Sequence, residues 1–183
     1  FPDVTLVGVL AADLSLYTPD YRAAERTFQL LTQAAGRAGR DARHGDVIIQ
    51  TYNPEHYSIV TAAEQDYETF YHQEMAYRRL MKYPPVNVLF TVQMASKSEA
   101  ALVEAADRLA AHITPQADEE KVQMIGPVDA SVYKINDIYR KILYLKQENY
   151  DILIKIRDNI DCFQQEKSEI FKGVVVQYID RRI

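Results

Sequence analysis

Two arginines and two glycines near residue 40 make up the part of the sequence best suited to binding a phosphate group. Gln33, Gly36, Arg37, Gly39 and Arg40 fall within eight residues, which we call the arginine-glycine segment. Arginine offers phosphate a planar, always charged set of donors, and glycine lets the backbone approach a ligand closely. In phosphoryl transfer such an arginine neutralises charge that develops on the γ-phosphate. A helix end finished with glycine and basic residues has a similar composition, but the whole segment, following a strand and a crossover helix, favours a phosphate site.

A second candidate site combines basic and aromatic side chains later in the chain. Lys134, Tyr139, Arg140 and Lys141 lie in or beside two segments that we interpret as paired strands. Basic side chains neutralise phosphates and tyrosine stacks on bases, so the group suits a nucleic acid. Charged residues also protect exposed strand edges. This alternative stays open because two aspartates lie close by in the sequence.

Composition limits the classes to which the protein can belong. The 183 residues are 48% hydrophobic and 26% charged, which is enough to bury a core in one medium domain or two small ones. The single cysteine, Cys162, excludes a disulfide framework and a cysteine zinc cluster within the chain, and we expect it to be buried. No apolar run approaches the roughly 20 residues of a membrane span. Because the net charge is −5, a nucleic-acid site must be a local patch.

The arginine-glycine segment lies within a predicted β-α-β unit. We interpret residues 4–10 as a buried strand, 21–38 as a helix and 47–50 as a second strand. A parallel strand pair with a crossover helix is the expected arrangement. Because a buried strand stands so close to the first residue, we expect the chain to be a segment of a longer protein. Residues 1–53 form the first predicted part of the chain.

A helical connector is predicted between two domains. Residues 54–83 keep a helical period and indicate one long helix or a helix pair. Pro84 and Pro85 end this pattern, because a proline disfavours helix at the residue before it. We therefore place the last domain at residues 84–183.

Residues 84–183 predict the element order βαββαβ, the split βαβ pattern of ferredoxin-like α/β folds. A capping box at Ser96–Glu99 predicts the start of the first helix, whose buried face is expected to include Val103 and Leu109. Asn149 is expected to cap the second helix. The predicted strands are residues 86–94, 122–132, 139–146 and 173–179.

The arginine-glycine segment resembles motif VI of superfamily 2 helicases, and its surroundings narrow the resemblance. The flanking stretches, Ala11–Thr32 and Gly45–His56, are similar to the replication-restart helicase family of primosomal protein N′ (PriA). Three later stretches resemble the C-terminal domain of that family: Tyr83-Pro84-Pro85, Gly126-Pro127 and Tyr139–Leu143. The resemblance covers essentially the whole chain and departs from the family pattern at Asp180–Ile183.

This resemblance implies the end of a RecA-like lobe in an ATP-dependent 3′–5′ DNA helicase that restarts stalled forks and loads the primosome. ATP and Mg²⁺ are then expected between two lobes, with Gln33, Gly36 and Gly39 beside the nucleotide. Arg37 and Arg40 would face the triphosphate, Arg40 as the arginine finger. The chain has no Gly-x-x-x-x-Gly-Lys-Ser/Thr loop and no Asp-Glu-x-His box, so we expect it to hydrolyse no ATP alone. Zinc is expected in the parent protein only.

The same resemblance implies partners for the C-terminal domain. Members of the family bind stalled forks and single-stranded DNA, and they engage the single-strand-binding protein and primosome proteins in the cytoplasm, away from any membrane. Two other interpretations stay open: a fragment of another superfamily 2 motor, such as an RNA helicase, and a non-enzymatic ferredoxin-like nucleic-acid-binding module. Competition between DNA and RNA distinguishes the two motors, and binding of an ATP analogue distinguishes a motor from a module.

Overall fold

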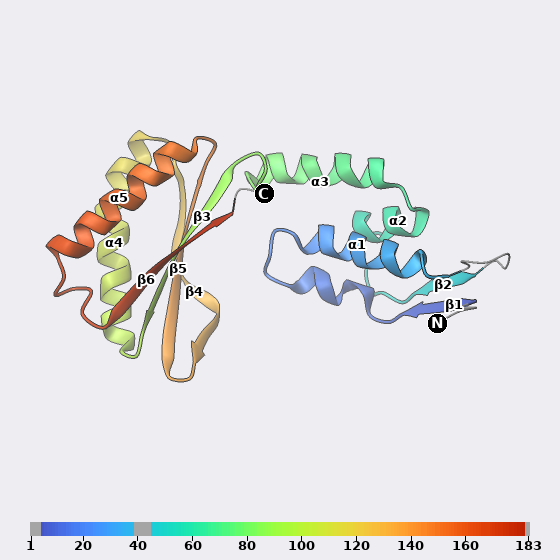
Figure 1. Ribbon diagram of the computed structural model, residues 1–183, viewed down its shortest axis with the longest axis horizontal. Coiled ribbons are helices and arrows are strands. Elements are labelled where there is room, and N and C mark those ends of the chain that lie inside the picture. The colour runs from blue at the N-terminus through green and yellow to red at the C-terminus, as the bar shows by residue number, and fades with distance from the viewer. Residues whose placement is uncertain (1–4, 39–44, 182–183) are drawn as a thin grey trace. The chain divides into compact units, whose positions relative to one another are not determined.

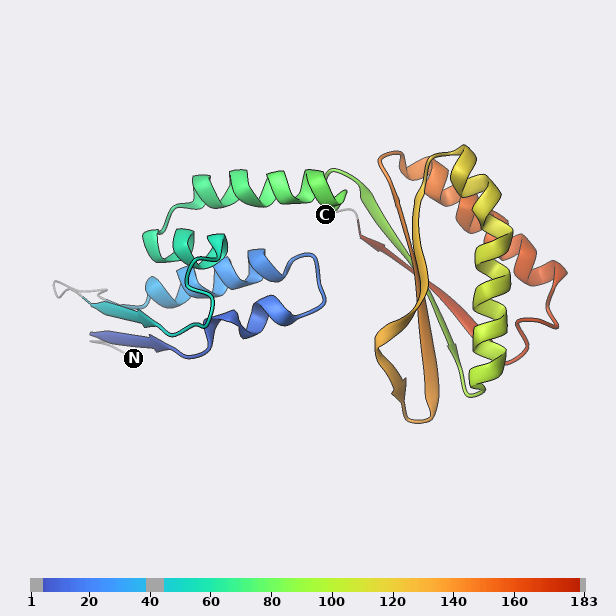
Figure 2. The same ribbon diagram turned by 180° about the vertical axis from the view of Figure 1, so that it is seen from behind.

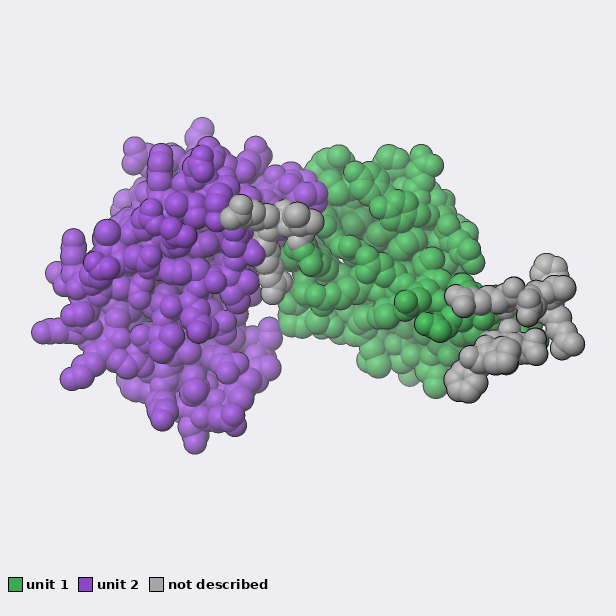
Figure 3. Space-filling model, in the orientation of Figure 1, with its two compact units in different colours: residues 1–80 green, residues 81–183 purple. Residues whose placement is uncertain are grey.

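The chain folds as two compact units. The computed structural model describes residues 5–38 and 45–181, with the backbone alone for residue 181 (Figure 1). The units comprise residues 1–80 and 81–183, coloured green and purple in Figure 3. Each has its own buried apolar cluster. Most of the predicted connector, residues 54–83, therefore packs as part of the first unit.

The first unit is built on a parallel β-α-β arrangement, as predicted. Its elements are β1 (Leu6–Val9), the 3-10 helix η1 (Ala12–Tyr17), α1 (Ala23–Ala35) and β2 (Asp46–Ile49). β1 and β2 pair in parallel, with Leu6 opposite Asp46 and Val9 opposite Ile49. The expectation of a buried first strand is wrong. Val9 and Ile49 pack against the apolar cluster of the unit, but Leu6 and Ile48 are 58% and 61% exposed.

Two further helices complete this unit. α2 (Tyr57–Glu64) and α3 (Tyr67–Met81) are separated at Gln65, whose φ of 56° lies in the left-handed region and breaks the helix. Of the two predicted alternatives, the helix pair is therefore the one that forms. The rings of Phe28 on α1 and Phe70 on α3 stack with centroids 4.1 Å apart, which joins α3 to the cluster between α1 and α2.

The second unit has the predicted split βαβ topology. Its sheet runs in the order β4-β5-β3-β6, and every neighbouring pair is antiparallel. This is the arrangement that the ferredoxin-like element order requires. The elements are β3 (Val88–Ser96), α4 (Glu99–Glu119), β4 (Gln123–Ile135), β5 (Ile138–Gln147), α5 (Tyr150–Glu166) and β6 (Val174–Arg181).

Both helices of the second unit cover the same face of its sheet. Figures 1 and 2 show α4 and α5 together on one side of the four strands, with the other side free of helices. The core lies between the two layers, where Leu109, Leu143 and Ile156 are fully buried. On the helix-free face Leu89 and Thr91 of β3 are still buried, whereas Gln93 and Ala95, further along the same strand, are partly exposed.

Three local predictions about the helices are wrong. α4 is capped by Ser98, whose Oγ accepts from the N–H of Ala101, while Ser96 Oγ donates to the carbonyl of Gly173 at 2.8 Å. Leu102 is buried instead of Val103, which is 37% exposed. Cys162 is exposed rather than buried. The predicted cap of α5 is confirmed, since Asn149 Oδ1 accepts from the N–H of Asp151 at 2.9 Å.

Candidate functional site

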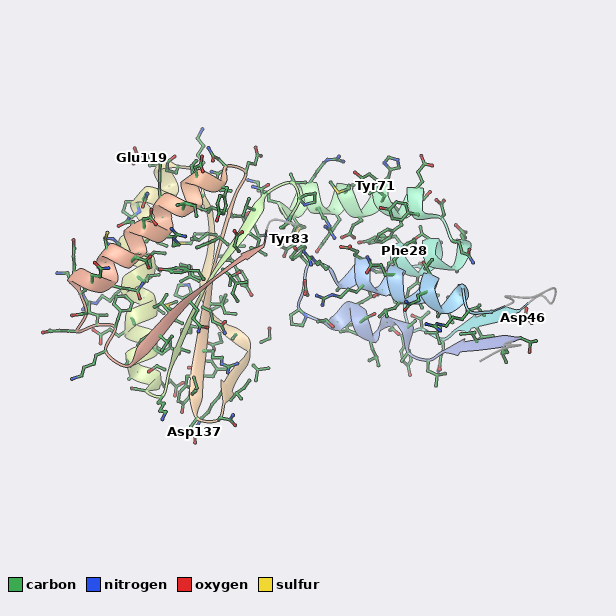
Figure 4. The ribbon with its side chains drawn as sticks, viewed as in Figure 1. Phe28, Asp46, Tyr71, Tyr83, Glu119 and Asp137 are labelled. Atoms are coloured by element: carbon green, nitrogen blue, oxygen red, sulfur yellow. The ribbon has the colours of Figure 1, made fainter. Side chains whose placement is uncertain are left out.

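The first candidate site begins at the C-terminal end of α1. This helix finishes at the same end of the unit as Asp46, the first residue of β2 (Figure 4). Gln33 and Arg37 are both exposed there, and Arg37 makes no ion pair with another described residue. Gly39 and Arg40 lie outside the described residues, so their roles stay predictions. The end of α1 thus presents one exposed amide and one uncompensated guanidinium.

Gly36 is not required by the backbone at this helix end. It follows α1 with φ −66°, a right-handed value that any residue adopts, and its N–H donates to the carbonyl of Thr32 at 3.0 Å. A Cβ at Gly36 would lie 3.5 Å from that oxygen, which is ordinary contact. A glycine that merely ends a helix usually takes a left-handed conformation. Because Gly36 is right-handed, the backbone conformation does not require a glycine at this position.

A buried ionic cluster holds α1 to α3 and α2. Arg78 on α3 donates from Nε to Glu74 Oε1 and from Nη2 to Glu25 Oε2 of α1, both at 2.7 Å. The hydroxyl of Tyr57 on α2 donates to the other oxygen of Glu74 at 2.5 Å. The side chains of Arg78 and Glu74 are only 9% and 6% exposed. The cluster therefore holds in place α1, the helix whose last turn leads into the arginine-glycine segment.

Burial and pairing have opposite effects on the pKa of Arg78 and act in the same direction on the pKa of Tyr57. Burial alone lowers the pKa of Arg78, but its hydrogen bonds to Glu74 and Glu25 outweigh burial, and the pKa rises. Burial and the hydrogen bond to Glu74 both raise the pKa of Tyr57. Sequence analysis missed this cluster, although the spacing of Glu74 and Arg78 by four residues on a helix is typical of an ion pair.

The second candidate site is largely neutralised by its own aspartates. Lys134 Nζ lies 3.0 Å from Asp137 Oδ1 and 4.8 Å from the ring centre of Tyr139. Lys141 Nζ donates to Asp129 Oδ1 at 2.8 Å, and its side chain is 15% exposed. The hydrogen bond to Asp137 raises the pKa of Lys134. Asp137 lies at the tip of the β4–β5 hairpin, as Figure 4 shows.

The pleat of β5 also divides the second candidate site between the two faces of the sheet. Lys141 is opposite Met94, a core residue, and Tyr139 packs against the core under α4 and α5. Arg140 is opposite Ala95 and belongs to the helix-free face, because successive side chains of a strand point to opposite sides. The structure therefore brings Lys134, Tyr139 and Lys141 together and separates Arg140 from them.

Neither a membrane span nor a metal-binding cluster is found in the described parts of the chain. No helix within residues 5–38 and 45–181 is long and apolar enough to cross a membrane. Over the same ranges, no group of three or more His, Cys, Asp or Glu side chains could hold a metal ion.

Comparison with known proteins identifies the second unit. The family model described as "Primosomal protein N C-terminal domain" matches residues 79–177, which include β3, β4, β5, both helices of that unit and the first half of β6. The match covers more than half of the chain. It also agrees with the antiparallel sheet and the two helices that pack on one of its faces.

Similar full-length proteins share one name. The chain is 46% identical over 150 residues to "Replication restart protein PriA" of Bacillus subtilis (strain 168), an alignment that covers 81% of this chain and 18% of that protein. It is 38% identical over 165 residues to the protein of the same name from Treponema pallidum (strain Nichols), an alignment that covers 90% of this chain and 25% of that protein. For the Synechocystis protein of that name the identity is 40% over 147 residues, covering 80% and 18%.

The aligned stretches occupy only part of those relatives. The chain spans between 18% and 25% of the length of these three proteins. The family model indicates which part that is, because the matched domain is named for the C-terminus. The chain belongs to the PriA family and corresponds to the part of those proteins that carries the C-terminal domain.

Proposed function

We propose that the chain is part of an ATP-dependent 3′–5′ DNA helicase that restarts stalled replication forks and loads the primosome. In this proposal the first unit supplies the motif VI arginines of a RecA-like lobe, and the second unit contributes DNA binding. The observation that carries the proposal is the exposed, uncompensated Arg37 beside Gly36, at the end of a crossover helix in a chain of the PriA family.

The end of α1 fits a phosphate group in its chemistry. Arg37 forms no ion pair among the described residues, and Gly36 adopts a conformation that needs no glycine. When bound, ATP with Mg²⁺ supplies the phosphoryl group that is transferred. Gln33 would orient a phosphate oxygen or a water molecule, and Arg37 and Arg40 would neutralise charge, with Gly39 beside them. The zinc of the parent protein is proposed to lie outside this chain.

Two features of the first unit support its place in a larger lobe. One face of the β1–β2 pair exposes Leu6 and Ile48, whereas parallel sheets are normally covered on both faces. Asp13 on η1 is 2% exposed, and neither of its carboxylate oxygens has a hydrogen-bond partner among the described residues. A buried carboxylate without a partner is costly. Helices of the same lobe packed on that face, and a donor to Asp13, would satisfy both features.

The second unit is proposed to bind DNA and to meet other replication proteins in the cytoplasm. The relatives are named for replication restart, and this name supports DNA rather than RNA as the nucleic acid. The single-strand-binding protein and primosome proteins are the proposed protein partners.

A phosphate-release assay tests whether ATP hydrolysis requires parts of the full-length protein outside this chain. The isolated 183-residue chain should hydrolyse no ATP with or without forked DNA, because the triphosphate-binding loop and the magnesium box are absent from its sequence. The full-length protein should hydrolyse ATP in a DNA-dependent manner and unwind a forked duplex. Turnover by the isolated chain that Arg40→Ala abolishes would contradict the proposal.

A further inference from the structure

A hollow lies on the helix-free face of the second unit. It has a volume of about 600 Å³ and is formed over strands β3, β5 and β6, within a single compact unit. This size falls within the range of roughly 300–1,000 Å³ that is typical of small-ligand pockets. None of the residues of the predicted DNA patch except Arg140 lines it.

The charges around the hollow are uniformly positive. Lys97 and Arg140 line it, and no aspartate or glutamate does. Neither cation forms an ion pair with another residue in the described ranges, in contrast to Lys134 and Lys141. An anionic group placed here therefore meets two uncompensated donors without competition from a neighbouring carboxylate.

The floor of the hollow offers hydrogen bonding and apolar contact in adjacent rows. Gln93 on β3 stands opposite Gln177 on β6, and Ala95 stands opposite Val175. Paired amides provide donors and acceptors that suit the edge of a nucleobase. Small apolar side chains accommodate a sugar or the face of a base. No aromatic side chain lines the hollow, so recognition here does not depend on stacking.

The backbone around the hollow favours a nucleotide over a peptide. A peptide that joins a sheet binds through main-chain hydrogen bonds along an edge strand. The hollow lies across β3, whose backbone is already paired with β5 on one side and β6 on the other. Over β3 and β5 side chains alone are available, since β6 is the only edge strand at the hollow. The set of two cations, two amides and two small apolar groups matches phosphate, base edge and sugar.

We propose that this hollow binds one nucleotide of single-stranded DNA, with its phosphate at Arg140 and Lys97 and its base edge at Gln93 and Gln177. This inference rests on the proposed function, because it takes DNA as the ligand of the second unit. It moves the main contact from the β4–β5 hairpin to the opposite face of the sheet. It also adds Lys97, Gln93 and Gln177, which nothing in the sequence singled out.

Fluorescence anisotropy with a labelled single-stranded oligonucleotide of mixed sequence tests the site on the whole chain. The Lys97→Gln/Arg140→Gln double variant should bind about tenfold more weakly or worse, since two charge-assisted contacts are lost. Its log–log salt slope should be shallower by about 0.7, because both cations contact one phosphate and each neutralised phosphate on a single strand contributes about 0.7. The matched control, Lys134→Gln/Lys141→Gln, removes the same charge from the other face and should change affinity less than about twofold, because each of these lysines is already paired with an aspartate.

A second variant tests the base contacts separately from charge. Gln93→Ala/Gln177→Ala should leave the salt slope unchanged and reduce the differences in affinity among oligonucleotides of single bases. Circular dichroism verifies that each variant is folded.

The possible failures can be told apart. If the unmodified chain binds no single-stranded DNA, both the proposed DNA-binding function and this site are wrong. If it binds DNA, and the control double variant loses affinity while Lys97→Gln/Arg140→Gln does not, the function stands and the site is wrong. Binding of a polyglutamate peptide in place of DNA, abolished by Lys97→Gln/Arg140→Gln, would assign the hollow to an acidic protein partner and overturn the inference.

Discussion

At the scale of single residues, position 126 requires a glycine because the surrounding backbone leaves no room for a side chain. Its φ is +111°, and a Cβ there would lie 2.7 Å from the carbonyl oxygen of Ile142 and 2.9 Å from the nitrogen of Val128. Both neighbours are backbone atoms and cannot move aside cheaply. Gly126→Ala should therefore lower the free energy of unfolding of the second unit by more than about 1 kcal/mol. Urea denaturation followed by circular dichroism measures this change.

Gly8 provides the matched control for this substitution. A Cβ at Gly8 meets nothing within 4 Å, so Gly8→Ala should leave the unfolding of the second unit unchanged. Equal effects of the two changes would show that crowding at Gly126 is not the cause.

The buried cluster around Arg78 predicts a larger effect in the first unit. Arg78→Met leaves the carboxylate of Glu74, itself 6% exposed, without its guanidinium partner. Breaking a buried pair from one side typically costs about 3–5 kcal/mol. Chemical denaturation should show this loss in the first unit. The neighbouring Arg79 is exposed, and Arg79→Met should cost less than about 0.5 kcal/mol. Similar stabilities for the two variants would contradict the account of the cluster.

Residue types were easier to predict than the partners of each residue. The basic and aromatic character of Lys134, Tyr139, Arg140 and Lys141 is visible in the sequence. That Asp137 and Asp129 neutralise two of the lysines depends on the hairpin register, which includes shifts between residues 125 and 128 and between 129 and 134. The irregular pairing of β4 with β5 thus decides which cations remain unpaired and able to bind a phosphate. No local sequence pattern predicts this irregularity.

At the scale of elements, α5 depends on a cap that the sequence predicts correctly. Asn149 satisfies the N–H of Asp151, which otherwise has no acceptor within the first turn of the helix. Asn149→Ala should lower the free energy of unfolding of the second unit by about 1 kcal/mol. Gln165→Ala, an exposed position near the other end of the same helix, should have almost no effect. Thermal unfolding followed by circular dichroism compares the two, and a neutral Asn149→Ala would argue against the cap.

The order of the helices and strands could be predicted from the sequence. Which residues of each helix are buried, and which residue caps it, could be predicted less well. The periods of strands and helices predict βαββαβ because each element has one apolar face turned to a shared core. On α4, however, several alanines surround the apolar stripe, and they leave two neighbouring apolar residues, Leu102 and Val103, as candidates for the same core position. Ser96 and Ser98 are equally good caps by type, and Ser96 is taken by the carbonyl of Gly173. Such choices depend on contacts that are distant in sequence.

At the scale of the whole molecule, the chain joins two units with separate cores. The parallel β-α-β arrangement and the ferredoxin-like sheet were both predicted from the order of the elements. The division of the chain depends on α2 and α3. Phe70 of α3 stacks on Phe28 of α1 and on Tyr57 of α2, and residues 54–80 belong to the first unit. A helical period by itself does not tell which core a helix joins. In our proposal, other parts of the RecA-like lobe supply the hydrogen-bond donor that Asp13 lacks and cover the exposed face of the β1–β2 pair.

ATP turnover of the full-length protein that contains this chain tests the central claim most directly. Arg40→Ala should reduce DNA-stimulated turnover by about 10³-fold or more while nucleotide binding is retained, as expected for an arginine that acts in the transition state. Arg37→Ala should also reduce turnover, with weaker nucleotide binding. Arg108→Ala, which changes an exposed arginine on α4 only 3.6 Å from Glu104, should leave turnover unchanged. If Arg37→Ala and Arg40→Ala both keep near-normal turnover, the arginine-glycine segment is a helix end and not part of an ATP site.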